Sequence, residues 1–177
     1  MTSETKAGVR VLGILGAADG NGVVHIEDRF DTDIQDMWSA LTDPKRLARW
    51  LGHVEGDLRL GGEYRANLHA TAWEGTGRVT ACDPPRSFTV VGKDPNEPNE
   101  ETTTVTLTAD GDQTLLVFEQ RGMPLENVAG YGAGNQIHIE DLTDHIAGKE
   151  RRTNVKERFD TLIAAYRPQA SKLNSVQ

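Results

Sequence analysis

The sequence is poor in cysteine and contains no long apolar run. Cys82 is its only cysteine, which excludes an internal disulfide and gives no indication of an oxidising compartment. No apolar stretch approaches the roughly 18 residues that a membrane-spanning helix needs. Residues 1–20 also lack the cationic start and the long apolar core of a signal peptide. We therefore expect a soluble, cytoplasmic protein without a membrane partner.

Positive charge is scarce as well. The chain has 19 Lys and Arg residues against 27 Asp and Glu, so its formal net charge is −8. An acidic surface without a Lys/Arg cluster repels nucleic acid, so we expect no nucleic-acid partner. The 177 residues fit one domain with a well-formed core. We place this domain at residues 9–166 and expect residues 1–8 and 168–177 to be disordered tails.

Motifs of the common catalytic classes are also missing. Ser39 and Ser87 have no histidine or acid placed by a motif, so no catalytic triad is predicted. Cys82 has no adjacent base or positive cluster, and we interpret it as a small buried hydrophobe. The glycine pair 61–62 lacks the strand-to-helix context and the lysine of a phosphate-binding loop. We therefore predict no catalytic residue.

The chain does contain repeated alternation of apolar and polar residues, which is typical of half-buried strands. Gly, Pro and Asp separate these segments, as expected of turns. The strands are predicted at 9–15, 23–30, 58–68, 73–82, 87–91, 102–109 and 114–120. Two short helices interrupt this order. Thr32 begins the first as part of a capping box, and Asp43 followed by Pro44 begins the second, which ends at Gly52.

The segment 131–148 shows helical spacing instead, with Ile139, Leu142 and Ile146 as its apolar stripe. A lone amphipathic helix that follows a run of strands must bury this stripe against their sheet. A second amphipathic segment begins after Thr153 and is expected to end before Pro168. Strands, two short helices, a meander and a C-terminal helix together predict one α+β domain.

This order resembles the helix-grip fold. The segments MWSALTDPKRLARWL, VEGDLRLGGEYRA, GTGRVTACDPPRSF and GDQTLLVFEQRGMP are similar to the family named for the activator of heat-shock-protein-90 ATPase. That family belongs to the START-like, or SRPBCC, superfamily, and the resemblance covers residues 23–148. It implies a START/Bet v 1-like fold, in which a curved antiparallel sheet of about six or seven strands wraps around a long C-terminal helix.

One position departs from the family pattern. Similar proteins often carry Trp where this chain has Asn135, near the start of the helix predicted at 131–148. A small amide in place of a large ring would enlarge or wet that end of the space between helix and sheet. A ligand known for relatives therefore need not fit this chain.

A curled sheet that faces one helix often leaves a cavity between them. The aromatic residues of the strands and of the first helix fit either a hydrophobic core or the wall of such a cavity, and we predict the latter for the set as a whole. The predicted ligand-binding residues are Trp38, Tyr64, Trp73, Phe88, Phe118, Asn135, His138 and Leu142.

Asp28 falls in the apolar phase of the strand predicted at 23–30. A charge at such a position must pair, shift its pKa or lie at a wet strand end. We favour a salt bridge with Arg29, Arg46 or Arg65. The alternative is a polar group of the cavity that acts as a general base, although no second catalytic group is evident.

The helix predicted at 131–148 carries His138, Asp141 and His145 on one side, at positions i, i+3 and i+7. Two imidazoles and a carboxylate are ligands that Zn²⁺ accepts. However, positions i and i+7 lie roughly 10.5 Å apart along a helix axis, too far for both imidazoles to reach one ion. We therefore predict no metal site and no cofactor, and we interpret His138 as a polar contact beside the cavity.

These patterns favour binding of a small apolar or aromatic molecule without catalysis, because the inner faces lack paired carboxylates and a histidine–nucleophile pair. One alternative is an enzyme of the polyketide-cyclase or hydrolase type that uses Asp28 with Tyr64 or His138. Another is a co-chaperone-like protein of the stress response, which the resemblance implies. A homodimer paired through sheet edges also remains open.

Overall fold

The computed structural model of the protein describes residues 9–175. The expected tail 1–8 and the last two residues of the expected tail 168–177 lie outside this range. The elements are β1 (Gly13–Ala18), β2 (Asn21–Phe30), α1 (Ile34–Thr42), α2 (Pro44–Trp50), β3 (Gly52–Gly56), β4 (Glu63–Leu68), β5 (Glu74–Asp83), β6 (Ser87–Lys93), β7 (Glu101–Asp110), β8 (Gln113–Pro124), η1 (Leu125–Asn127), α3 (Val128–Ile146) and α4 (Val155–Asn174).

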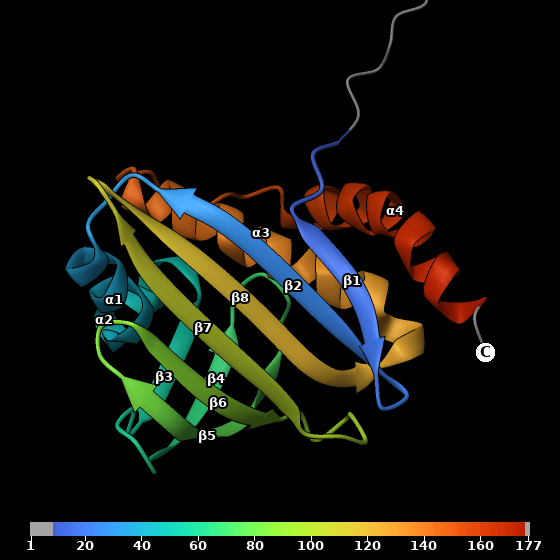
Figure 1. The fold of residues 1–177 in the computed structure, drawn as a ribbon, viewed down its shortest axis with the longest axis horizontal. Coiled ribbons are helices and arrows are strands. Elements are labelled where there is room, and N and C mark those ends of the chain that lie inside the picture. Colours follow the sequence, from blue (N-terminus) through green and yellow to red (C-terminus); the bar gives the residue numbers. More distant parts are fainter. Residues whose placement is uncertain (1–8, 176–177) are drawn as a thin grey trace, which may run out of the picture.

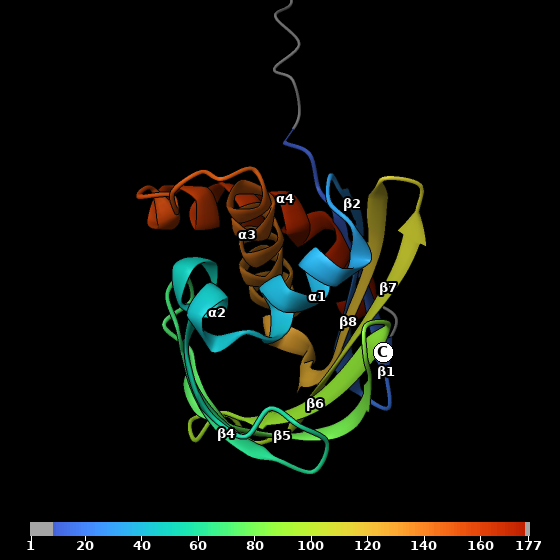
Figure 2. The same ribbon diagram turned by 90° about the vertical axis from the view of Figure 1, so that its left-hand side faces the viewer.

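The strands form one antiparallel sheet in the order β1-β2-β8-β7-β6-β5-β4-β3. Figures 1 and 2 show that this sheet curls strongly and that α3 runs along its concave face. The predicted α+β helix-grip fold is therefore confirmed. The sheet has eight strands, one more than the sequence suggested, because β3 was not predicted. Its residues do not alternate, and the strand exists through its pairing with β4.

The two short helices close one end of the curled sheet (Figure 2). The cap of α1 is Asp33, whose side chain accepts a hydrogen bond from the Asp36 N–H, and not Thr32 as expected. Thr32 bonds the Asp36 carboxylate instead. Asp43 caps α2 as predicted, with Pro44 in its first turn. These local signals fix where the chain turns back towards the sheet.

The core lies between α3 and the concave face of the sheet. Ile139 and Leu142 are buried there, as the helical spacing predicted, and Ile146 is half-buried. No helix within residues 9–175 is long and apolar enough to cross a membrane.

The helix α4 continues through Pro168 to Asn174, so the expected end before Pro168 is wrong. Proline removes one helical hydrogen bond, but tertiary contacts on both sides of it offset the loss. Tyr166 and Ala170 are buried, and the Gln169 side chain bonds the backbone of the edge strand β1. The C-terminal helix is therefore part of the folded domain through Asn174.

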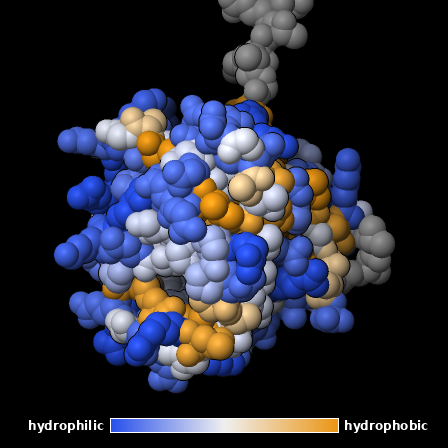
Figure 3. All heavy atoms as spheres, turned by 60° about the vertical axis from the view of Figure 1, so that its left-hand side comes forward, coloured by the Kyte–Doolittle hydropathy of each residue, from blue (hydrophilic) through white to orange (hydrophobic). Residues whose placement is uncertain are grey.

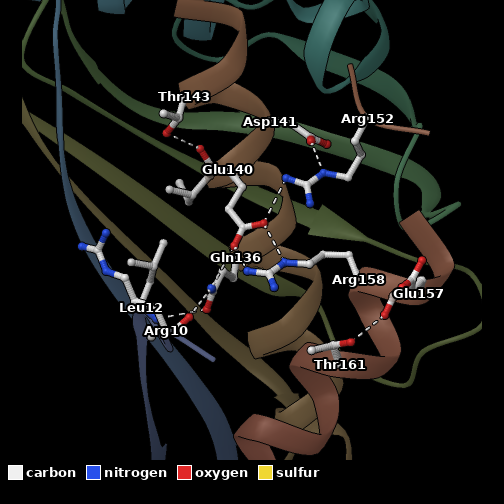
Figure 4. A network of polar contacts seen from close by, with 12 residues as sticks. Arg10, Leu12, Gln136, Glu140, Asp141, Thr143, Arg152, Glu157, Arg158 and Thr161 are labelled. Carbon is white, nitrogen blue, oxygen red and sulfur yellow. Dashed lines mark hydrogen bonds and ion pairs between the residues drawn. The ribbon is translucent and has the colours of Figure 1, made fainter. Parts of the chain in front are cut away.

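A polar network fixes α3 against its neighbours (Figure 4). Gln136 bonds the backbone of Arg10 and Leu12 in the segment before β1. Glu140 pairs with Arg158 of α4 and with Arg152 of the connection between the two helices. These contacts hold one face of α3 and leave another face turned to the sheet.

Candidate ligand-binding site

A hollow with a volume of about 1650 Å³ lies between the concave face of the sheet and α3. Side chains of α1, α2 and α4 complete its wall. Figure 3 shows apolar side chains gathered around a recess in the lower part of the face that it draws. Leu58 and Leu60, from the loop between β3 and β4, line the hollow, and Leu60 is 64% exposed. The hollow is therefore open to solvent near an apolar rim.

All eight residues predicted for the cavity line this hollow. They are Trp38, Tyr64, Trp73, Phe88, Phe118, Asn135, His138 and Leu142. Their lining position is a geometric fact, and their role in binding a ligand stays a prediction.

Three neighbouring strands place apolar side chains in one row on the concave face. Phe88 of β6 lies opposite Val105 of β7, which in turn lies opposite Phe118 of β8. Trp38 of α1 packs edge-on against Phe88, with ring centroids 5.8 Å apart and an interplanar angle of 71°. One part of the wall is therefore aromatic and relatively rigid.

Two glycines of β5 leave room for aromatic rings. A Cβ atom on Gly77 would lie 2.4 Å from the Tyr64 ring, and one on Gly75 would lie 2.6 Å from the Trp73 ring. A larger residue at Gly77 would displace the Tyr64 ring, and one at Gly75 would also meet the backbone oxygen of Lys93 at 2.3 Å. Burial raises the pKa of Tyr64 to about 12, so its phenol stays neutral at physiological pH.

The face of α3 that lines the hollow carries Tyr131, Asn135, His138 and Leu142, spaced as one side of a helix. The Nε2 atom of His138 is buried and has no hydrogen-bond partner within residues 9–175. Burial also lowers the pKa of His138 to about 4, so the ring is neutral near physiological pH.

The polar groups of the wall bond to one another. The Tyr131 hydroxyl donates to Oε1 of Glu101, and Nε2 of Gln120 donates to Oε2 of Glu101 at 3.0 Å. Nδ2 of Asn135 donates to Oε1 of Gln120 at 2.6 Å. Glu101 is only 6% exposed, and this burial raises the pKa of its carboxyl, although the hydrogen bond from Tyr131 opposes the shift.

Sequence reasoning missed Glu101, Gln120 and Tyr131. Glu101 lies one residue before the strand predicted at 102–109 and therefore outside every predicted element, although it keeps the phase of Thr103. Gln120 likewise keeps the phase of Phe118. The alternation along each strand was the available signal.

Asp28 does not line the hollow. It is half-buried, and its Oδ1 accepts a hydrogen bond of 2.9 Å from the N–H of Arg29. The expected salt bridge is wrong for the described part of the chain, since Arg29 pairs with Asp110 and Arg46 with Asp36. Asp28 instead lies near a strand end, where the adjacent backbone satisfies it.

The residues His138, Asp141 and His145 do not converge. Asp141 turns away from the hollow and accepts a hydrogen bond of 2.7 Å from Arg152. His145 accepts a hydrogen bond of 3.1 Å from Nε of Arg46. Of the three, only His138 lines the hollow.

Comparison with known proteins agrees with this architecture. The family described as Activator of Hsp90 ATPase homolog 1-like protein matches residues 31–147. The chain belongs to this family. The match spans α1, α2, the six strands β3 to β8 and all of α3, and it begins just after the β1–β2 hairpin. The predicted membership is therefore confirmed.

Solved structures share the fold of this family member. CalU16 from Micromonospora echinospora is 24% identical over 90% of this chain and 96% of its own, with a TM-score of 0.73. EF2215 from Enterococcus faecalis is 16% identical over 91% of both chains, with a TM-score of 0.69. DynU16, from the dynemicin biosynthetic locus, is 23% identical over 75% of this chain and 50% of its own, with a TM-score of 0.66. No curated protein matches significantly. At these identities the structures establish the fold alone.

Proposed function

We propose that the protein binds a small apolar or aromatic molecule in the hollow between the sheet and α3, without transforming it. The observation that carries this proposal is the hollow itself, about 1650 Å³ in volume and open beside an apolar rim. Small-molecule sites are typically concave and largely apolar, with few polar groups that fix orientation. The row of Phe88, Val105 and Phe118 supplies the apolar wall, and Asn135 and His138 supply polar groups.

The arrangement of the polar groups supports binding rather than catalysis. General acid–base catalysis needs a group within hydrogen-bond reach of the reacting atom. Both carboxyl oxygens of Glu101 are instead occupied by Tyr131 and Gln120. Asp28, the base of the cyclase or hydrolase alternative, does not line the hollow. A chaperone partner and a homodimer stay predictions.

Native mass spectrometry and thermal-shift screening of the purified protein test the proposal. We expect either a co-purified small molecule or stabilisation by members of a panel of lipids, aromatic polyketides and simple aromatics. A panel that gives neither result would overturn the proposal.

Two matched variants on β7 test whether a compound that stabilises the protein binds inside the hollow. Thr103 lines the hollow, whereas Thr106 is exposed outside the lining. Thr103→Trp fills part of the hollow and should abolish or weaken the stabilisation by a hit. Thr106→Trp should leave it unchanged. Equal effects of the two substitutions would place the bound compound outside the hollow.

A further inference from the structure

The polar groups at the wall of the hollow form a chain of hydrogen bonds with a single direction. Both oxygens of Glu101 accept, one from the Tyr131 hydroxyl and one from Nε2 of Gln120. Gln120 must therefore turn its amide N–H towards Glu101 and its carbonyl oxygen towards α3. That oxygen accepts from Nδ2 of Asn135. A carboxylate offers acceptors alone, so Glu101 fixes the orientation of every amide that follows it.

Asn135 is the last residue in this series of hydrogen bonds, and the series decides which of its side-chain atoms stays unpaired. Asn135 uses its N–H on Gln120, which leaves its Oδ1 as an acceptor. Within residues 9–175 no hydrogen bond reaches this Oδ1, and Asn135 lines the hollow. An amide at this position could point either way if Gln120 were free to rotate. Its orientation is set from Glu101, two side chains away.

His138 supplies a second, independent sign of a ligand. It follows Asn135 by three residues, so the two side chains are neighbours on the face of α3 that lines the hollow. Its Nε2 is buried and unpartnered within residues 9–175. Buried polar atoms without a partner are rare in native proteins, and each calls for an explanation. A polar group of a bound molecule beside Asn135 would provide the missing partner.

We propose that Asn135 and His138 form a subsite for the hydroxyl group of an uncharged, otherwise apolar molecule, and that Glu101 is the positioning residue that aims the Asn135 oxygen at it. The hydroxyl donates its hydrogen to Oδ1 of Asn135, and its oxygen accepts a hydrogen bond from Nε2–H of His138. This inference rests on the proposed function, because it names the polar part of the molecule that the hollow binds.

The charges around the subsite disfavour an anionic ligand. Asp94, Glu97 and Glu101 all line the hollow, and Asp94 and Glu97 lie close enough to Glu101 and Tyr131 for their charges to raise the pKa of both groups. An acid or phosphate placed there would face carboxylates in a partly desolvated site, where like charges repel strongly. A neutral hydroxyl avoids this repulsion and satisfies both Asn135 and His138.

Three naphthalenes substituted at the same ring position test the subsite by isothermal titration calorimetry at neutral pH. Naphthol donates and accepts a hydrogen bond, methoxynaphthalene only accepts, and methylnaphthalene does neither. We expect naphthol to bind about tenfold more tightly than methoxynaphthalene, which is the usual effect of one hydrogen bond to a buried partner, and methylnaphthalene to bind more weakly than both.

Variants then separate the roles of the residues. Glu101→Gln can keep every bond of the chain in either direction, because its amide and the Tyr131 hydroxyl both donate and accept, so Asn135 is free to turn its N–H to the hollow. The tenfold preference for naphthol over methoxynaphthalene should then fall to about onefold, whereas methylnaphthalene should bind as before. His138→Phe should weaken naphthol and methoxynaphthalene, whose oxygens both accept from the imidazole, and leave methylnaphthalene unchanged. The matched substitution His53→Phe, at an exposed site outside the lining, should change nothing.

Three outcomes would count against the inference, and each removes a different part of it. Equal binding of the three compounds to the unaltered protein would remove the subsite and leave the proposed function intact. Binding of none of them would count against the proposed function, and the subsite would fall with it. A preference for naphthol that Glu101→Gln leaves unchanged would remove the positioning role of Glu101.

Discussion

The Tyr166 hydroxyl donates a hydrogen bond of 2.7 Å to Oε1 of Gln136 while it accepts one of 2.8 Å from the N–H of Gly13. Tyr166 lies on α4, Gln136 on α3 and Gly13 at the start of β1. Both Tyr166 and Gln136 are buried. The phenol of Tyr166 therefore joins α4, α3 and the edge strand β1.

Tyr166→Phe should destabilise the fold. The substitution keeps the ring but leaves the Gly13 N–H without its acceptor, and Oε1 of Gln136 keeps only the Leu12 N–H as a donor. An unsatisfied buried polar group costs about 1–3 kcal/mol, so we expect the free energy of unfolding in urea to fall by about that amount. Tyr131→Phe is a useful comparison, because it removes a hydroxyl beside the hollow and leaves the junction of α4 intact. An unchanged urea midpoint for Tyr166→Phe would contradict this role.

The same junction shows why the end of the chain could not be predicted. From the sequence, Pro168 and the polar residues after it indicated a disordered tail. The contacts that carry α4 past Pro168 join it to residues more than 150 positions away, such as Leu15, whose N–H bonds Gln169. No local pattern contains such a pairing. The strand β3 was missed for the same reason, since its partner β4 defines it.

Sequence patterns predicted the elements that depend on local periodicity and local capping residues. The alternation at 102–109 correctly predicted β7, in which Val105 and Leu107 are buried on one face, and Asp43 with Pro44 correctly marked the start of α2. The apolar members of the candidate site followed from the same alternation. Its polar chain did not, because Glu101 and Asn135 become related only through Gln120 on a third element.

His138 should make the stability of the protein depend on pH. Burial lowers its pKa to about 4 from an ordinary value of 6.5. Between these values the unfolded chain binds a proton that the folded protein does not, so stability falls as the pH decreases from 6.5 towards 4. The full effect is about 3 kcal/mol.

Urea denaturation at a series of pH values measures this contribution. His138→Phe should lose less stability than the unaltered protein across the same pH range. The exposed His53 provides the control, since His53→Phe should keep the original pH dependence. Identical pH profiles for His138→Phe and the unaltered protein would show that the imidazole is not held neutral.

Arg152 should stabilise the junction of α3 and α4 through a buried charge. Its guanidinium donates to Asp141, whose side chain has no exposed surface, and also pairs with Glu140 at 3.0 Å. Removing one partner of a buried ion pair typically costs about 3–5 kcal/mol, because the other charge is left uncompensated. We expect Arg152→Met to reduce the free energy of unfolding by this order.

The matched control is Arg59→Met. Arg59 pairs with Asp57, but its side chain is 89% exposed, so its removal should leave the urea midpoint unchanged. In the Arg152→Met variant, acid should lessen the defect, because protonation neutralises Asp141, whose pKa burial already raises. Equal effects of the two arginine substitutions would show that burial of Asp141 does not decide the stability of this junction.

Asn135→Trp should weaken binding in the hollow without unfolding the protein. Asn135 lines the hollow, so a Trp side chain can extend into open space and reduce the volume left for a ligand. It also removes the N–H that bonds Gln120 and the oxygen that faces the ligand. We therefore expect naphthol and methylnaphthalene both to lose affinity in calorimetry, and naphthol to lose more. Asn67→Trp, on an exposed site of β4 outside the lining, should bind both compounds as before. Unchanged affinity in Asn135→Trp would mean that these compounds bind away from α3, because no molecule in contact with this face of the helix could ignore a ring placed there.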